Sequence, residues 1–271
     1  MLDIENLRVE YRPKGFRRPP FVAVDDVSLA IAEGETLGLV GESGSGKTTI
    51  GRALLGLAPV SGGRITFEDT DISHLNRRER RVISRDIQVV FQDPYSSLNP
   101  SMTVGDILSE PLRVQGVGGR EAQARIASLL DQVGLPQDAV RRLPREFSGG
   151  QRQRVGIARA LALSPRLIVC DEPVSALDLT TQARVLDLFL DIQEQTGVAY
   201  LFISHDLDVV RHISHRIAVL YRSRLVEMGD AIELTDMPRH PYTKRLLASS
   251  PVLDPDKQAA RREERQRLSY V

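Results

Sequence analysis

The sequence predicts an α/β fold: a mainly parallel sheet core, an antiparallel β part at the start of the chain, and a helical part in the middle. From residue 167 to residue 221 short apolar segments alternate with helical patterns, which is typical of right-handed βαβ units and a parallel sheet. A Gly- and Ser-rich turn joins the apolar segment 36–40 to a helical pattern. Residues 93–163 hold helical patterns separated by Pro and Gly, which predicts a helical subdomain.

The first part of the chain predicts antiparallel strands. Residues 2–11 partly alternate between apolar and polar side chains, and a basic, Pro-rich loop separates them from the apolar stretch 21–31. This pattern indicates two strands with a hairpin-like connection. The elements expected next are listed by residue: a buried strand at 36–40, a helix from Lys47 to about Leu57, and a strand at 64–67 after the turn at Gly62 and Gly63.

The remaining elements follow from apolar periodicity and from the positions of Pro and Gly. Strands are expected at 87–91, 167–170, 198–203 and 217–221. Helices are expected at 104–114, 120–133, 151–163, 181–195 and 207–212. The tail at 257–267 is dense in Arg, Lys and Glu, which predicts a solvated helix or a frayed end.

Composition narrows the classes of function. Among 271 residues, Lys plus Arg and Asp plus Glu each number 36, so we expect no nucleic-acid partner. Cys170 is the single cysteine; the chain can form no internal disulfide and no multi-cysteine metal site. The start of the sequence lacks the pattern of a signal peptide, and no run approaches the length of about 18 apolar residues that a membrane helix needs. We therefore expect a cytosolic protein, or one that reaches a membrane by binding a partner.

The segment GESGSGKT at residues 41–48 has the phosphate-loop pattern: two glycines with four residues between them, followed by Lys and Thr. Glycines let the backbone wrap closely around phosphates, and the helix that follows adds its positive N-terminal end. Lys47 is expected to reach the β- and γ-phosphates of ATP, and Thr48 to offer its hydroxyl to Mg²⁺. The loop lies between a predicted strand and a predicted helix, as this chemistry requires.

A pair of acidic residues ends the predicted strand LIVCDEP at 167–173. The end of a parallel strand places a carboxylate beside the phosphate loop. Asp171 is expected to hold Mg²⁺ through its water shell, and Glu172 to polarise the attacking water. An acidic pair alone is more often a turn or a helix cap, and it is the phosphate loop that favours the catalytic interpretation.

The segment FSGGQRQRVGIARAL at 147–161 completes a pattern that resembles the nucleotide-binding subunits of ABC transporters, with Phe147 where Leu is usual. The resemblance implies a P-loop NTPase cassette in which two cassettes pack head to tail. The signature of one cassette then meets the γ-phosphate held by the other, where a helix N-terminus faces an anion. This trans signature consists of Ser148, Gly149, Gly150 and Gln151.

The same resemblance assigns further site residues. Gln92 matches the Q-loop and would contact Mg²⁺ or water, Asp178 in SALD matches the D-loop, and His205 matches the switch histidine at the γ-phosphate. Tyr11 is the candidate aromatic platform for adenine, from its spacing before the loop and because base–aromatic stacking tolerates many sequences. The full set expected to contact ATP is Tyr11, Gly41, Ser43, Gly44, Ser45, Gly46, Lys47, Thr48 and Thr49, and the expected Mg²⁺ ligands are Thr48, Gln92 and Asp171.

Two segments resemble the dipeptide and oligopeptide importer branch, which also includes nickel and glutathione importers: FQDPYSSLNPSMTVGDIL at 91–108 and HPYTKRLLASSP at 240–251. The resemblance implies a nucleotide-binding domain at 1–232, with its helical subdomain at about 93–163, and a C-terminal extension at 233–271. It implies two membrane permease subunits, a second and different ATPase chain, an extracytoplasmic substrate-binding protein, and a location on the cytoplasmic face of the cell membrane.

Some members of this branch bind an iron–sulfur cluster through a cysteine-rich C-terminal segment. Since Cys170 is the one thiol here, we expect no such cluster on this chain. Two other classes stay open beside the importer subunit: a non-transport ABC ATPase of DNA repair or translation, and a catalytically inactive cassette. The short stretch 93–147 and the single cassette disfavour the first class, and the complete motif set disfavours the second. The basic loop with Arg12, Lys14, Arg17 and Arg18 is expected to be a solvated turn.

Overall fold

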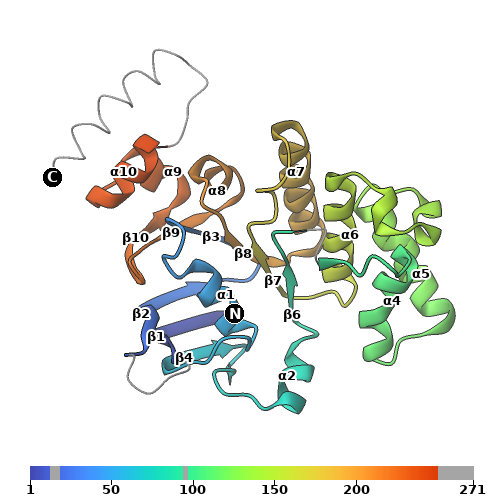
Figure 1. Ribbon diagram of the computed structural model, residues 1–271, viewed down its shortest axis with the longest axis horizontal. Helices are drawn as coiled ribbons and strands as arrows, with labels where there is room; N and C mark the ends of the chain where they lie inside the picture. The colour runs from blue at the N-terminus through green and yellow to red at the C-terminus, as the bar shows by residue number, and fades with distance from the viewer. Residues whose placement is uncertain (13–18, 94–96, 250–271) are drawn as a thin grey trace. The chain divides into compact units, whose positions relative to one another are not determined.

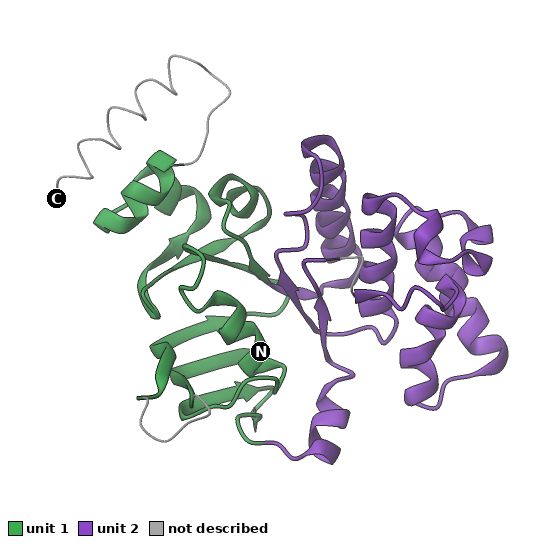
Figure 2. Ribbon diagram, in the orientation of Figure 1, with its two compact units in different colours: residues 1–74, 202–271 green, residues 75–201 purple. Residues whose placement is uncertain are grey.

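The computed structural model of the chain describes residues 1–12, 19–93 and 97–249. The chain forms two compact units (Figure 2): residues 1–74 with 202–271, and residues 75–201. In the described ranges, no helix combines the length and the apolar character needed to cross a membrane. The domain boundaries at 232 and 233, and those of the helical subdomain, stay predictions beside this division.

An antiparallel sheet forms the start of the first unit, as predicted. Its strands are β1 (Leu2–Tyr11), β2 (Phe21–Ile31), β4 (Gly62–Phe67) and β5 (Thr70–Asp71), in the order β2-β1-β4-β5. Figure 1 labels the first three of this order. Buried side chains alternate along β1, which places its apolar residues on one face of the sheet. The pairing register runs from Leu2 opposite Ile31 to Tyr11 opposite Phe21.

The rest of the first unit contains a parallel pair of strands. β3 (Thr36–Val40) is buried throughout and pairs in parallel with β9 (Arg216–Tyr221), while β10 (Arg224–Asp230) pairs antiparallel with β9. The helix α1 (Lys47–Leu54) follows β3.

The helix α8 (Leu207–Ile213) packs against β3 at Gly38, where an added Cβ would lie 2.0 Å from Cγ1 of Val210. A glycine at this point therefore allows the helix to approach the strand closely. Two further helices follow β10, α9 (Ala231–Asp236) and α10 (Pro241–Ser249).

The second unit holds a parallel pair of strands, β6 (Ile87–Val90) and β7 (Leu167–Asp171), in register from Ile87 opposite Leu167 to Val90 opposite Cys170. The strand β8 (Ala199–Ile203) spans the boundary between the units. These parallel pairs confirm the predicted parallel sheet.

The helices of the second unit are α2 (Arg77–Ile83), α4 (Val104–Val114), α5 (Gly119–Gln132), α6 (Gly149–Leu161) and α7 (Leu179–Thr196), with 3₁₀ turns at Gln137–Arg141 and Pro144–Glu146. The helix α6 packs against α4, α5, α7 and β6. The described residues between β6 and β7 form helices and no strand, which confirms the helical patterns expected at 104–163 (Figure 1).

Several boundaries differ from the prediction. The first helix ends at Leu54 and not near Leu57, because Gly56 adopts a φ of 72° and Leu57 turns outward with 65% of its surface exposed. The helix expected at 181–195 begins at Leu179, and the one expected at 151–163 spans Gly149–Leu161. The predicted tail at 257–267 and most of the basic loop, with Lys14, Arg17 and Arg18, lie outside the described residues.

Candidate nucleotide and hydrolysis site

The phosphate loop runs from the end of β3 to the start of α1. Within it, Lys47 is 5% exposed, and its Nζ donates hydrogen bonds to the carbonyl oxygens of Gly41 (2.7 Å) and Glu42 (2.9 Å). These contacts hold the ammonium group against the first two peptides of the loop. The cation therefore lies inside the segment whose sequence predicts phosphate binding.

Two glycines of the loop are required by its backbone. Gly46 has a φ of 107°, and an added Cβ would lie 2.4 Å from the carbonyl oxygen of Ala23. Gly41 has a φ of 151°, and its Cβ would lie 2.2 Å from the carbonyl oxygen of Leu220. Side chains at these positions would meet neighbouring backbone as well as an unfavourable φ, so only glycine fits.

The start of α1 suits an anion. Among the residues that the structure describes, no side chain caps this helix, and its first turn carries no acidic residue. The partial positive charge of the N-terminus therefore meets no carboxylate of that turn. The Ser45 hydroxyl is buried and has no hydrogen-bond partner among the described residues. A phosphate oxygen would satisfy it. Ser43 and Gly44 are exposed, while Thr48 and Thr49 lie half-buried in the first turn.

The same unit holds two other predicted site residues. Tyr11 lies at the end of β1 with 37% of its surface exposed, and His205 is exposed two residues after the end of β8. Phe21, which the sequence interpretation did not single out, lies opposite Tyr11 in the sheet and is 61% exposed. Phe21 could have been identified as an exposed aromatic residue that lies opposite Tyr11, the candidate platform for adenine.

In the second unit, the structure brings two predicted catalytic residues together. Gln92 follows β6 and Glu172 follows the neighbouring β7, and Nε2 of Gln92 donates to Oε2 of Glu172 over 3.2 Å. Glu172 also has a φ of 50°. A non-glycine residue with a positive φ is strained, and such strain concentrates at functional sites. Asp171 lies at the end of β7, half-buried.

The signature segment begins α6 through a capping box. Ser148 is the N-cap residue: its Oγ accepts from the backbone N–H of Gln151, and the Gln151 side chain accepts from the backbone N–H of Ser148. At Gly150 an added Cβ would lie 2.3 Å from Cγ2 of Thr181 at the start of α7. Helix capping and helix packing therefore account for part of this motif, and its role toward a γ-phosphate stays a prediction. Ser148 itself is exposed.

Asp178, the predicted D-loop residue, caps α7. Its carboxylate accepts from the backbone N–H of Thr181 (3.0 Å) and from the Thr181 hydroxyl (2.7 Å). These hydrogen bonds, with the hydroxyl contributing most, lower the pKa of Asp178 below its ordinary value. Asp178 is thus an exposed carboxylate that stays ionised at the start of a helix.

The predicted site residues divide between the units. The first unit contains the loop, Tyr11 and His205, and the second contains Gln92, Asp171, Glu172, Asp178 and the signature. The expected Mg²⁺ ligands divide likewise: Thr48 belongs to the first unit, Gln92 and Asp171 to the second. Each of these three side chains offers an oxygen atom, the donor that Mg²⁺ prefers in proteins.

Cys170 lies in β7, beside the acidic pair, and is fully buried. Burial, with the neighbouring Asp171 adding to it, raises the pKa of this thiol well above its ordinary value. The group is therefore a neutral packing residue of the strand.

A strand, a glycine-rich loop and a helix with an uncapped N-terminus define a P-loop protein. The chain belongs to the ABC transporter family, whose model matches residues 24–175. A second model, described as the C-terminal region of oligopeptide/dipeptide transporters, matches residues 226–270. These matches confirm the predicted family and its branch.

Curated relatives are similar over most of this chain. It is 53% identical over 233 residues to the oligopeptide transport ATP-binding protein OppD of Mycobacterium tuberculosis, covering 86% of this chain and 38% of that protein. It is 52% identical over 241 residues to the glutathione import ATP-binding protein GsiA of Escherichia coli, covering 89% of this chain and 39% of that protein. The chain thus spans about two fifths of the length of these relatives.

A solved structure confirms the fold class. It is the dimeric, post-hydrolysis state of the ATP-binding cassette MJ0796 bound to ADP and Pi. The TM-score is 0.75 with 29% sequence identity, and the match covers 85% of this chain and 99% of the other. The α/β P-loop cassette expected from the sequence is therefore the fold of this chain.

Proposed function

We propose that the chain is an ATP-hydrolysing cassette that drives an ABC importer, with di- or oligopeptides as its cargo. The observation that carries the proposal is that one chain joins a phosphate loop to a C-terminal region of the oligopeptide/dipeptide transporter type. Glutathione is a second candidate cargo, since GsiA, a glutathione import protein by name, is 52% identical.

In this proposal, ATP binds along the phosphate loop. Lys47 pairs with the β- and γ-phosphates, and the loop from Gly41 to Thr49 supplies backbone N–H groups and hydroxyls around them. Thr48, Gln92 and Asp171 would hold Mg²⁺, which would neutralise charge on the phosphates. The uncapped start of α1 and the Ser45 hydroxyl without a partner in the described chain support this assignment.

Tyr11 is proposed to stack on adenine. Replacing Tyr11 by Ala should weaken ATP binding by about 1–3 kcal/mol, the range for a base–aromatic stack, or roughly 5- to 150-fold in the dissociation constant. Tyr11→Phe retains the ring and should bind ATP almost normally. An unchanged dissociation constant for Tyr11→Ala would place the platform elsewhere, and Phe21→Ala then tests the exposed ring opposite it.

Hydrolysis is assigned to residues that follow β6, β7 and β8. Glu172 takes a proton from the attacking water, and Gln92, hydrogen-bonded to Glu172, orients that water. His205 donates to the γ-phosphate as charge develops. The hydrogen bond between Gln92 and Glu172 supports the proposal that these two residues act together.

Two cassettes are proposed to close head to tail over ATP. Ser148, Gly149, Gly150 and Gln151 of one chain then meet the γ-phosphate held by its partner, and Asp178 lies across the interface. Ser148 is exposed and begins a helix, and an exposed helix N-terminus favours an anion. The partner is proposed to be a second, different cassette, and two permeases and an extracytoplasmic binding protein complete the importer at the cytoplasmic face of the membrane.

Ser148→Arg tests this closure. The larger, charged side chain would occupy the place where helix and phosphate must meet, so ATP turnover of the assembled complex should fall to the slow level of the isolated chain. Nucleotide binding to this chain's own loop should stay normal. Ser128→Arg, at an exposed position of α5 in the same unit and outside the signature, is the size- and charge-matched comparison. Full turnover by Ser148→Arg would contradict the head-to-tail arrangement.

Transport itself is tested by reconstitution. The chain would be co-expressed with candidate permeases and a candidate second cassette, placed in proteoliposomes, and supplied with a binding protein and labelled peptides or glutathione. We expect ATP-dependent peptide uptake. Uptake of glutathione alone would replace the proposed cargo. Absence of any association with permeases would contradict the importer function.

A further inference from the structure

The C-terminal extension touches the phosphate loop through one side chain. The hydroxyl oxygen of Tyr242, in α10, accepts a hydrogen bond of 2.8 Å from the backbone N–H of Glu42. These residues are 200 positions apart, and both belong to the first unit. Tyr242 is 2% exposed, so its ring is fixed by packing.

Aromatic stacking sets the direction of this hydroxyl. The Tyr242 ring stacks on Tyr221, at the end of β9, with ring centroids 4.1 Å apart and planes 27° apart. The guanidinium of Arg245, one turn along α10, lies 5.5 Å from the Tyr242 ring centroid and 5.8 Å from that of Tyr221. Stacked rings with an adjacent cation are a favourable arrangement. The phenol is therefore held in place before any nucleotide binds.

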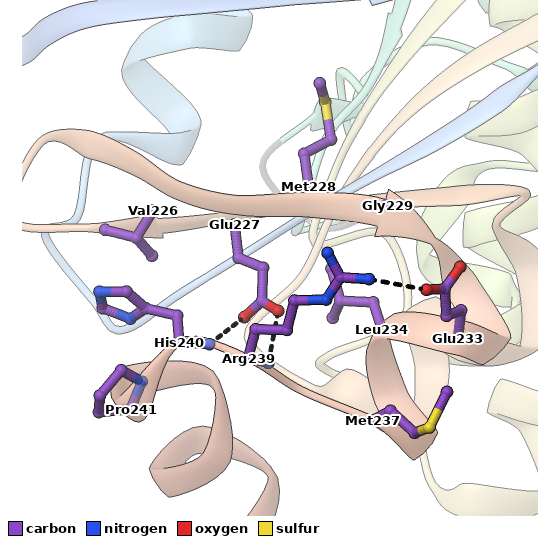
Figure 3. A pocket seen from close by; sticks show the side chains of 10 residues that line it. All are labelled: Val226, Glu227, Met228, Gly229, Glu233, Leu234, Met237, Arg239, His240 and Pro241. Atoms are coloured by element: carbon purple, nitrogen blue, oxygen red, sulfur yellow. Dashed lines mark hydrogen bonds and ion pairs between the residues drawn. The ribbon is translucent and has the colours of Figure 1, made fainter.

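A second anchor fixes the start of α10. Glu227 on β10 accepts hydrogen bonds from the backbone N–H groups of Arg239 (2.7 Å) and His240 (3.0 Å), as Figure 3 shows. Burial raises the pKa of Glu227, but hydrogen bonds that include these two outweigh it and lower the pKa below its ordinary value. Nδ1 of His240 then accepts from the backbone N–H of Tyr242 over 3.1 Å. The segment from Glu227 to Tyr242 is thus tied together, beside a cavity of about 590 Å³.

Both backbone groups of Glu42 are hydrogen-bonded. Its N–H donates to Tyr242, and its carbonyl accepts from Lys47 Nζ. If the Lys47 ammonium pairs with phosphates, fewer of its three N–H donors remain for the carbonyls of Gly41 and Glu42. The Tyr242 hydroxyl, together with the backbone N–H of Ser45, which donates to the Glu42 carbonyl over 3.2 Å, then keeps the entry of the loop in place. The contribution of Tyr242 therefore grows when nucleotide binds.

We propose that Tyr242 is a positioning residue for the phosphate loop: its hydroxyl holds the Glu42 peptide, and through it the C-terminal extension supports nucleotide binding. The inference rests on the proposed function, because it assumes that nucleotide binds in this loop. Its physical basis is a shift in population. Without the hydroxyl, the entry of the loop samples other conformations, and the affinity for nucleotide falls in proportion to the fraction of molecules in the binding form. By linkage, bound nucleotide must in turn stabilise α10.

The test is Tyr242→Phe in the full chain, which removes one oxygen and keeps the stacked ring. We expect the dissociation constants of Mg-ADP and Mg-ATP to rise about three- to tenfold, the range for losing one hydrogen bond. Tyr221→Phe removes a hydroxyl from the partner ring and should change neither constant. Calorimetric titration well below the melting temperature measures the constants, with folding checked by circular dichroism.

Hydrogen exchange provides a readout that a merely structural role would not change. Mg-ADP should slow amide exchange in residues 241–249 of the unmodified chain, and it should do so less in Tyr242→Phe. A lower melting temperature with unchanged dissociation constants would show that Tyr242 only stabilises the fold, and would overturn the proposal. Should Tyr242→Phe fail to fold, hydrogen exchange of the unmodified chain decides. If Mg-ADP does not slow amide exchange in residues 241–249, the proposal is overturned.

The inference and the proposed function fail differently. If the unmodified chain binds neither Mg-ADP nor Mg-ATP, the proposed function fails. If it binds both and Tyr242→Phe binds them equally well, only the role of Tyr242 fails.

Discussion

Replacing Glu172 by Gln should abolish ATP turnover and leave ATP binding close to that of the unmodified protein. The substitution keeps the shape of the side chain, and its amide oxygen can still accept from Nε2 of Gln92, as Glu172 does now. It removes the charge that polarises the attacking water. Loss of a general base costs about 10²- to 10⁴-fold in rate, so phosphate release by the complex should fall by at least about 100-fold.

The control for Glu172→Gln is Glu194→Gln, which makes the same change of charge on the exposed face of α7. Phosphate release and equilibrium ATP binding would be measured for both variants. The Glu172 variant should trap the ATP-bound, closed complex, whereas the Glu194 variant should cycle normally. Near-normal hydrolysis by Glu172→Gln would remove Glu172 from its assigned role, and so would a loss of ATP binding.

Replacing Lys47 by Ala should eliminate measurable nucleotide binding. Lys47 is 5% exposed, and its ammonium lies against the Gly41 and Glu42 carbonyls. Its loss removes the fixed cation for the β- and γ-phosphates and two hydrogen bonds that shape the loop. Each hydrogen bond to a charged group contributes about 1.5–3 kcal/mol, so we expect the dissociation constant to rise by about 100-fold or more.

Two companion variants separate charge from packing. Lys47→Met keeps the buried stem and removes only the ammonium, so it should bind nucleotide as poorly as Lys47→Ala. Lys244→Ala removes an exposed cation from α10 and should bind normally. Binding of Mg-ATP by Lys47→Met with unchanged affinity would mean that the loop does not hold the phosphates.

The sequence was most informative where burial and motif agree. The strand Thr36–Val40 is buried at every position, and the helix Val104–Val114 has a regular apolar face; both were predicted with their observed ends. The phosphate loop was predictable because its function fixes residue types at fixed spacing. Apolar periodicity and loop chemistry reflect the local sequence, and the local sequence determines these elements.

Elements with little burial were missed. The helix α2 buries none of its side chains, so no apolar period marks it, although the capping box of Asn76 and Glu79 was a usable start signal. The strand β10 is half-exposed along its length and shows no regular alternation. Partial burial weakens the period on which strand prediction depends.

Contacts between distant segments could not be predicted from spacing. Gln92 and Glu172 are 80 residues apart and meet because β6 and β7 are neighbours in the sheet. The hydrogen bond from Glu42 to Tyr242 depends on how α10 packs, which no motif in the phosphate loop encodes. Such pairs follow from the tertiary arrangement, and they hold the new information about the site.

The most direct test of the central claim is a structure of the ATP-trapped complex formed with Glu172→Gln. We expect ATP on the phosphate loop of this chain, with its γ-phosphate near Lys47 and the signature of the partner cassette across from it. Ser148 of this chain should likewise face the nucleotide held by the partner. If ATP is absent from the loop at residues 41–48, or if Ser148 faces this chain's own nucleotide or none, the account of this protein as an ATP-driven, head-to-tail cassette is contradicted.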